Sequence, residues 1–226
     1  MTFILIYLHG KRKASLSNQM RQSKAMSPDY SVRWWQEKNL HPPDVNPEMF
    51  FQKRIRWRYK KGLPTVHASQ MMLGDSCDLM ESIKQKVFNG EEPRVKLLFT
   101  SPPYYGVTNY YYDQWLRIWM LGGPDRPSRL GEAHKGKFEA KMTYEKLLST
   151  VFGGAAEIMN EDGLVYVRTD AREFTLSTTL TILEESFPGW TISTTRQPFR
   201  KRTQTALFGD TKPKPGEVDV VLSASK

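Results

Sequence analysis

The pattern of apolar and polar positions changes near residue 64, from irregular to an alternation of strand-like and helix-like stretches. Beyond that point, short apolar runs predict strands at 66–73, 95–100 and 164–168, and helical periodicity predicts helices at 78–88, about 143–159 and about 173–187. Segments 191–195, 205–208 and 218–222 predict a further strand and a closing hairpin with a basic, proline-rich loop. This order predicts an α/β fold with a mostly parallel sheet, a C-terminal antiparallel hairpin, and ligands at the carboxyl ends of the strands.

The same pattern divides the chain into two regions. Residues 1–63 form a basic N-terminal region of helix and linker, and residues 64–226 form the part that we expect to carry the chemistry. The first region contains one well-marked helix, which starts at Asn46-Pro47 and ends at Gly62 as its C-cap. Residues 1–61 hold 13 Lys and Arg against 4 Asp and Glu, so the whole formal excess of +9 lies in this quarter of the chain.

Basic residues interleaved with aromatic ones favour a nucleic acid partner, because phosphates neutralise the charge and bases stack on the rings. The candidates are Lys53, Arg54, Arg56, Arg58, Lys60 and Lys61, beside Trp57 and Tyr59, together with Arg200, Lys201 and Arg202 in the hairpin loop. A solvated helix face that binds nothing is an equally open interpretation of the charge alone.

Composition excludes several classes of protein. With 226 residues, of which 39% are hydrophobic and 12% aromatic, the chain is not mainly disordered and suits one domain, or one domain plus an appendage. The single cysteine, Cys77, cannot form an internal disulfide, and the four histidines show no metal-ligand spacing, so we expect no metal. The longest apolar run, residues 3–8, is far shorter than the ~20 residues of a membrane-spanning helix, so we expect a soluble, cytoplasmic protein.

The segment with the clearest chemical content is Thr100-Ser101-Pro102-Pro103-Tyr104, directly after an apolar strand. Two consecutive prolines fix the backbone direction and remove two N–H donors, which leaves the carbonyls of Ser101 and Pro102 free to face a cleft. A hydroxyl, a carbonyl and an aromatic ring together suit a planar group that carries an NH2. Such a site orients the lone pair of a weakly nucleophilic amine toward an electrophile. A turn that merely ends the strand is the competing interpretation.

Ser101-Pro102-Pro103-Tyr104 at a strand end resembles the catalytic motif of the S-adenosylmethionine-dependent DNA amino-methyltransferases, which modify the exocyclic amine of cytosine or adenine. The resemblance covers most of the chain, including Gly74-Asp75-Ser76 and segments 106–115 and 164–170. It implies a Rossmann-like methyltransferase fold, S-adenosylmethionine as cofactor and duplex DNA as substrate. A serine at the first motif position is more typical of cytosine-N4 than of adenine-N6 enzymes.

The resemblance also implies roles for single residues. Tyr104 would stack on a base flipped out of the duplex, while Ser101 and the carbonyl of Pro102, followed by Pro103, hold the amine. Asp75, Ser76 and Thr100 would lie on the cofactor side. For Asp75, capping of the helix that follows is an equal alternative.

One expected feature of the family is missing. Its members carry a glycine-rich cofactor loop after a strand, and no segment of this chain resembles one. We therefore expect the chain to be the catalytic half of a split methyltransferase, with the loop on a second polypeptide and with an apolar sheet edge or helix surface exposed for that partner. Two alternatives remain: a non-catalytic, nucleic-acid-binding remnant, and an amino-methyltransferase that acts on RNA or a protein amide.

Overall fold

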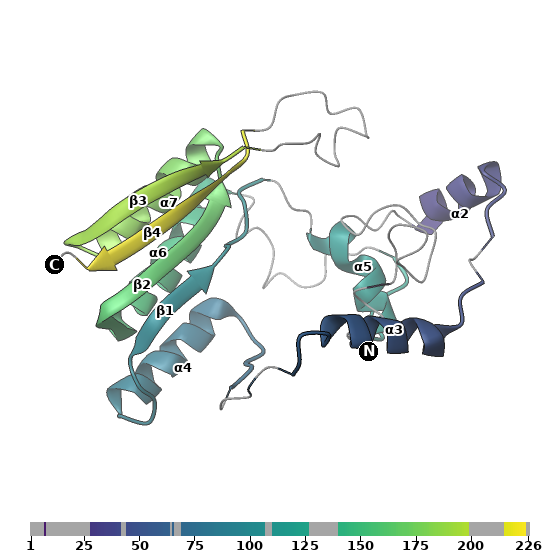
Figure 1. Ribbon diagram of the computed structural model, residues 1–226. Coiled ribbons are helices and arrows are strands. Elements are labelled where there is room, and N and C mark those ends of the chain that lie inside the picture. The colour runs from purple at the N-terminus through teal and green to yellow at the C-terminus, as the bar shows by residue number, and fades with distance from the viewer. Residues whose placement is uncertain are drawn as a thin grey trace. The chain divides into compact units, whose positions relative to one another are not determined.

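The computed structural model describes residues 7, 28–41, 44–63, 65, 69–106, 110–126, 140–198 and 215–224. The chain forms two compact units, one of residues 1–70 and 109–132 and the other of residues 71–108 and 133–226. We describe each unit by itself (Figure 1). The division predicted at residues 63 and 64 stays a prediction about domain organisation.

The first unit is helical where it is described. It contains α2 (Pro28–Glu37), α3 (Pro47–Arg58) and α5 (Tyr110–Met120). Helix α3 begins as predicted, because Oδ1 of Asn46 accepts a hydrogen bond from the backbone N–H of Met49 at 3.0 Å. It ends earlier than predicted, with Tyr59 rather than Gly62 at the C-cap position. No helix in the described part of the chain has the length and apolar character needed to cross a membrane.

The second unit contains a four-stranded sheet in the order β1-β2-β4-β3. Its strands are β1 (Val95–Thr100), β2 (Met159–Asp170), β3 (Trp190–Gln197) and β4 (Glu217–Ala224). Strand β1 pairs with β2 in parallel, whereas β4 pairs with both β2 and β3 in antiparallel fashion. Three strands therefore share one direction and β4 runs against them, as Figure 1 shows. This confirms the predicted α/β class, and the antiparallel C-terminal pair is β3 with β4. Only one of the three strand pairs in the described residues is parallel, so a mostly parallel, Rossmann-like sheet is not confirmed.

Three helices accompany the sheet: α4 (Ser76–Phe88), α6 (Lys141–Ile158) and α7 (Glu173–Ser186). The core forms where α6 and α7 pack on one sheet face, because inward-facing positions of the strands and one side of each helix are apolar. The most buried core side chains are Tyr144, Leu148, Phe152, Val165, Val167, Leu183, Val218, Val220 and Leu222. All three helices lie within two or three residues of their predicted bounds.

The opposite face of the sheet is open along β1. Leu97 and Phe99 point away from the core and are 53% and 72% exposed, and Leu164 of β2 is also exposed. Nearly all-apolar runs such as 95–100 and 164–168 are typical of strands that are buried on both faces, and the structure does not bury them in that way. These runs have a covering layer on only one side among the described residues, and β1 lies at the edge of the sheet.

The predicted strand at 66–73 is wrong where the structure describes it. Residues 69–73 belong to no strand, and the side chains of Met71 and Leu73 are almost fully exposed. Residues 66–68 lie outside the described part, as does the predicted segment 205–208 of the hairpin.

Gly216, which precedes β4, has a backbone conformation that requires glycine. Its φ is +92°, and a Cβ there would lie 2.5 Å from the carbonyl oxygen of Gln197. Gly90 is a matched control, because its φ is +75° but a Cβ would meet no atom within 4 Å. We expect Gly90→Ala to lower the free energy of unfolding by about 1 kcal/mol and Gly216→Ala by about 2–3 kcal/mol, as measured by urea denaturation. Equal losses in the two variants would contradict the close approach at Gly216.

Candidate active site

The motif Ser101-Pro102-Pro103-Tyr104 begins directly after the last residue of β1, Thr100. Thr100 lies opposite Val167 of the parallel neighbour β2, so the motif sits at the carboxyl ends of two parallel strands. The predicted position of the motif is therefore confirmed. The roles of its residues stay predictions.

The two consecutive tyrosines after the prolines take different environments. Tyr105 packs against the hydrophobic core, with its ring centroid 4.7 Å from that of Phe174 and 5.8 Å from that of Tyr144. Tyr104 instead makes its contacts with polar side chains at the strand ends. Tyr105 therefore holds the loop against the core, whereas the side chain of Tyr104 lies among the polar side chains at the strand ends.

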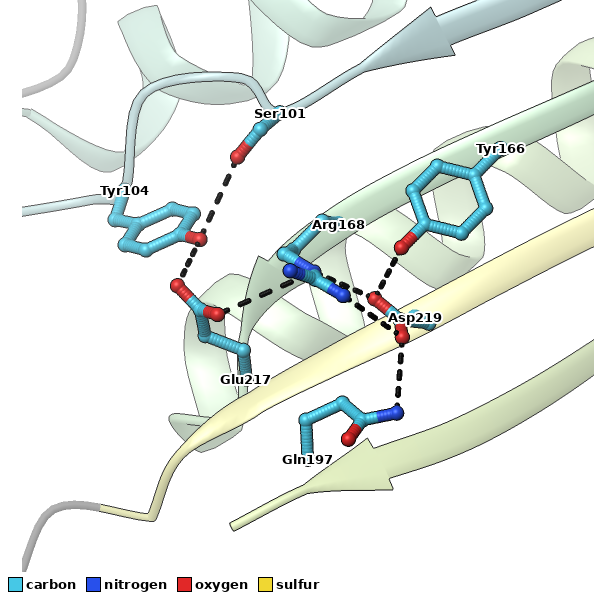
Figure 2. A network of polar contacts seen from close by, with 7 residues as sticks. All are labelled: Ser101, Tyr104, Tyr166, Arg168, Gln197, Glu217 and Asp219. Carbon is cyan, nitrogen blue, oxygen red and sulfur yellow. Dashed lines mark hydrogen bonds and ion pairs between the residues drawn. The ribbon is translucent and has the colours of Figure 1, made fainter. Parts of the chain in front are cut away.

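The hydroxyl of Tyr104 lies between Ser101, in the loop after β1, and Glu217, at the start of β4. It donates a hydrogen bond to Oε1 of Glu217 at 2.9 Å and lies 3.4 Å from Oγ of Ser101 (Figure 2). Glu217 is the first residue of β4, 113 positions further along the chain. Burial of the phenol, with a further contribution from the carboxylate of Glu217, raises the pKa of Tyr104 to about 12. The hydroxyl is therefore a protonated donor at neutral pH.

A second polar group lies on the same face of the sheet, around Asp219 of β4. Nε and Nη2 of Arg168 donate to its two carboxylate oxygens at 2.7 and 3.1 Å. The hydroxyl of Tyr166 donates to Oδ1 at 2.6 Å, and Nε2 of Gln197 donates to Oδ2 at 3.1 Å. Figure 2 shows both groups joined by Arg168, whose Nε is 4.0 Å from Oε2 of Glu217.

The sequence prediction missed all the members of this network except the motif residues themselves. Tyr166 and Arg168 alternate with buried valines in β2, and Glu217 and Asp219 do the same in β4. Alternation places each pair on one face, and the register sets Arg168 directly opposite Asp219. An opposite-charge pair on adjacent strands was the signal that could have identified them.

The carboxylate of Asp219 gives a testable dependence of stability on pH. Its hydrogen bonds from Arg168, and then from Tyr166, lower its pKa to about 2. The folded state thus favours the ionised form, and its stabilising contribution is complete above the unfolded pKa of ~3.9 and is lost as the pH falls toward 2. We expect the difference in unfolding free energy between wild type and Asp219→Asn to be constant from pH 5 to 7 and to shrink below pH 4. A difference that does not change in urea denaturation between pH 2 and pH 6 would contradict this assignment.

The residues predicted on the cofactor side have structural contacts of their own. Oδ1 of Asp75 accepts a hydrogen bond from the backbone N–H of Cys77 at 2.9 Å, so Asp75 is the N-cap of α4. Ser76 is the first residue of that helix and is exposed, and Thr100 is partly buried at the end of β1. Cofactor binding by these three residues stays a prediction.

The glycine-rich cofactor loop that the family resemblance implies has no counterpart among the glycine pairs of the described residues. Gly153 and Gly154 lie inside α6, and Gly122 and Gly123 directly follow α5 in the other unit. None of these pairs follows a strand. Within the described part of the chain, no cluster of three His, Cys, Asp or Glu side chains could hold a metal ion either.

The basic residues predicted to bind nucleic acid lie on and after α3, a helix with no buried residue. The guanidinium of Arg54 stacks on the rings of Tyr7 and Phe50, 4.9 and 5.2 Å from their centroids. The exposed Trp57 lies between Arg56 and Arg58. The other candidates, Arg200, Lys201 and Arg202, lie outside the described residues.

No protein-family model matches the chain, and no curated protein matches it. Among solved structures, it is similar to M1.HpyAVI in complex with SAM (13% identity, TM-score 0.38) and to M1.HpyAVI alone (13%, 0.36). A third is TTHA0409 of Thermus thermophilus, assigned provisionally as a DNA modification methylase (10%, 0.35). The matches cover 69%, 69% and 70% of this chain and 55% of each of the others, so the chain spans about half their length. At these TM-scores the similarity assigns neither a fold nor a function.

Proposed function

We propose that this chain is the catalytic half of a DNA amino-methyltransferase, which moves a methyl group from S-adenosylmethionine to the exocyclic amine of a base, with cytosine N4 favoured over adenine N6. The observation that carries the proposal is the placement of Ser101 and Tyr104 together at the carboxyl end of β1. This is the end of a parallel strand pair at which α/β proteins bind ligands. The preference for cytosine rests on the serine at position 101.

The geometry of the motif suits a planar base with an amino group. The ring of Tyr104 offers a stacking face, which a base can occupy only after it leaves the duplex. Oγ of Ser101 and the carbonyl of Pro102 then offer acceptors for the two amine hydrogens. The nitrogen lone pair is thereby directed out of the base plane toward the methyl donor. The N–C bond would form as the methyl–sulfur bond of S-adenosylmethionine breaks, with S-adenosylhomocysteine as the leaving group and one amine proton released to solvent.

Duplex DNA is proposed as the substrate because of the basic helix α3. Its four basic candidates, the two lysines that follow it, its exposed Trp57 and its lack of buried residues are the features that suit phosphate contacts with added stacking. Phosphate contacts of this kind position the nucleic acid but do not select a sequence.

A second polypeptide is proposed because the chain lacks the glycine turn and presents an open sheet edge. Strand β1 has no neighbour on its outer side among the described residues, so backbone N–H and C=O groups there are available for pairing. Leu97 and Phe99 add exposed apolar side chains at the same strand. A partner strand that extends the sheet at β1 would satisfy the backbone groups and bring its own glycine turn next to the motif.

Binding of S-adenosylmethionine distinguishes the proposed methyltransferase from a non-catalytic, nucleic-acid-binding remnant. The candidate partner is the product of a neighbouring reading frame that carries a strand followed by a glycine-rich turn. Equilibrium dialysis with labelled S-adenosylmethionine should show binding by the mixture of both chains and none by this chain alone. Absence of binding by the mixture would contradict the methyltransferase proposal.

A further inference from the structure

The polar network in Figure 2 includes residues outside the motif, namely Tyr166, Arg168, Gln197, Glu217 and Asp219. Four strands contribute to it or adjoin it, and it links the end of β1 to β2, β3 and β4 on the open face of the sheet. Its member nearest the motif is Glu217, whose carboxylate accepts the hydrogen bond from Tyr104.

Glu217 is itself held in place. The residue before it, Gly216, accepts a hydrogen bond at its carbonyl from the backbone N–H of Ala171 at 3.1 Å, and its positive φ sets the direction in which β4 starts. Glu217 then pairs with Asp170 of β2 on one side and with Gln197 of β3 on the other. Its backbone is therefore fixed between two strands before its side chain reaches Tyr104.

The side chain of Glu217 has one cationic neighbour in the network, Arg168, and that neighbour is oriented by Asp219. The two parallel hydrogen bonds between Arg168 and Asp219 fix the guanidinium plane. The hydroxyl of Tyr166 fixes Asp219 in turn, and the ring of Tyr166 stacks on Phe99 of β1 with centroids 4.9 Å apart. These contacts connect Glu217, through the polar network and the ring of Tyr166, to β1, the strand that precedes the motif.

The direction of the hydrogen bonds has a consequence for Ser101. A carboxylate can only accept, so the single hydroxyl proton of Tyr104 goes to Glu217. The oxygen of Tyr104 is then left as an acceptor toward the Ser101 hydroxyl, 3.4 Å away. If Ser101 directs its proton there, its lone pairs are free to accept the hydrogens of an amine.

We propose that Glu217 is a positioning residue, which fixes the plane of the Tyr104 ring and sets Ser101 as a hydrogen-bond acceptor for the substrate amine. The inference rests on the proposed function for the identity of the substrate. Anchoring the phenol removes ring motion before the base arrives, so the base loses less free energy to ordering when it stacks. Arg168 and Asp219 act through Glu217 and do not touch the substrate.

The first test compares Glu217→Ala with Glu217→Gln in the enzyme assembled with its cofactor half. A glutamine side-chain oxygen still accepts from Tyr104, whereas alanine leaves the phenol without its acceptor. We expect Glu217→Ala to lower kcat about 10-fold or more and Glu217→Gln to stay within about 3-fold of wild type. The exposed Glu184 of α7 serves as control, and Glu184→Ala should leave kcat unchanged. Equal losses for alanine and glutamine at position 217 would overturn the proposal.

A double-mutant cycle separates positioning from a general effect on the fold. Tyr104→Phe keeps the ring but removes the hydroxyl, so Glu217→Ala should cause no further loss of kcat in the Tyr104→Phe background. A purely structural Glu217 would make the alanine variant equally harmful in both backgrounds, and that result would overturn the proposal.

A spectroscopic readout does not depend on activity. With 3-fluorotyrosine incorporated into this chain, the resonance missing from Tyr104→Phe identifies residue 104 by fluorine NMR. Glu217→Ala should shift that resonance, and Glu184→Ala should not. An unshifted resonance would overturn the role of Glu217 whatever the activity. A shifted resonance in a chain whose assembled form transfers no methyl would leave the anchoring in place and refute the proposed function instead.

Discussion

Replacement of Tyr104 by alanine is expected to lower the rate of methyl transfer by the assembled enzyme about 5- to 150-fold. Stacking of a base on an aromatic side chain contributes roughly 1–3 kcal/mol, and about 1.4 kcal/mol corresponds to a factor of ten. Alanine removes both the stacking face and the hydroxyl that Glu217 and Ser101 contact. The measurement is the initial rate of labelled methyl incorporation into unmodified duplex DNA.

The adjacent tyrosine provides the control for this prediction. Tyr105 packs in the core against Tyr144 and Phe174, so Tyr105→Phe keeps its packing and should keep the rate. Ser101→Ala should also reduce the rate, because it removes the proposed amine acceptor, by about 2- to 10-fold. Full activity in both Tyr104→Ala and Ser101→Ala would show that the site has been assigned wrongly.

Association with the cofactor half is expected to depend strongly on the open edge of the sheet. Burial of a phenylalanine side chain contributes about 1.5–3 kcal/mol, so Phe99→Ala should weaken the association about 10-fold or more. Phe99 is suited to this test because it is 72% exposed and lies outside the core, so its removal leaves the packing of α6 and α7 intact. Analytical ultracentrifugation of the mixed chains gives the dissociation constant.

Leu121 is a matched control for Phe99, because it is an exposed apolar residue that follows α5 in the other unit. Leu121→Ala should bind the partner as wild type does. If both variants bind equally tightly, the partner does not dock at β1.

Local sequence signals predicted the elements whose determinants are local. The run 95–100 followed by Pro102-Pro103 placed β1 and its end, and Asp75 before an amphipathic stretch placed the start of α4. The same signals failed at 66–73, because an apolar segment becomes a strand only when a neighbouring strand pairs with it. Residues 69–73 belong to no strand in the structure.

Neither the exposure of one face of the sheet nor the polar network around Glu217 could be predicted from any single segment of the sequence. Leu97 and Phe99 belong to a run that is typical of a buried strand, and their exposure follows from the edge position of β1 and from the absence of a covering layer among the described residues. The contact of Tyr104 with Glu217 joins positions 113 residues apart. Only the pairing of β1 with β2 and of β2 with β4 brings such distant residues together.

The most direct test of the central claim is transfer of labelled methyl from S-adenosylmethionine to unmodified duplex DNA, followed by digestion to nucleosides. The assay compares this chain, the candidate cofactor half and their mixture. We predict label in N4-methylcytosine with the mixture alone. Label in N6-methyladenine would correct the choice of base, and the absence of label from DNA with both chains present would contradict the assignment as a DNA amino-methyltransferase.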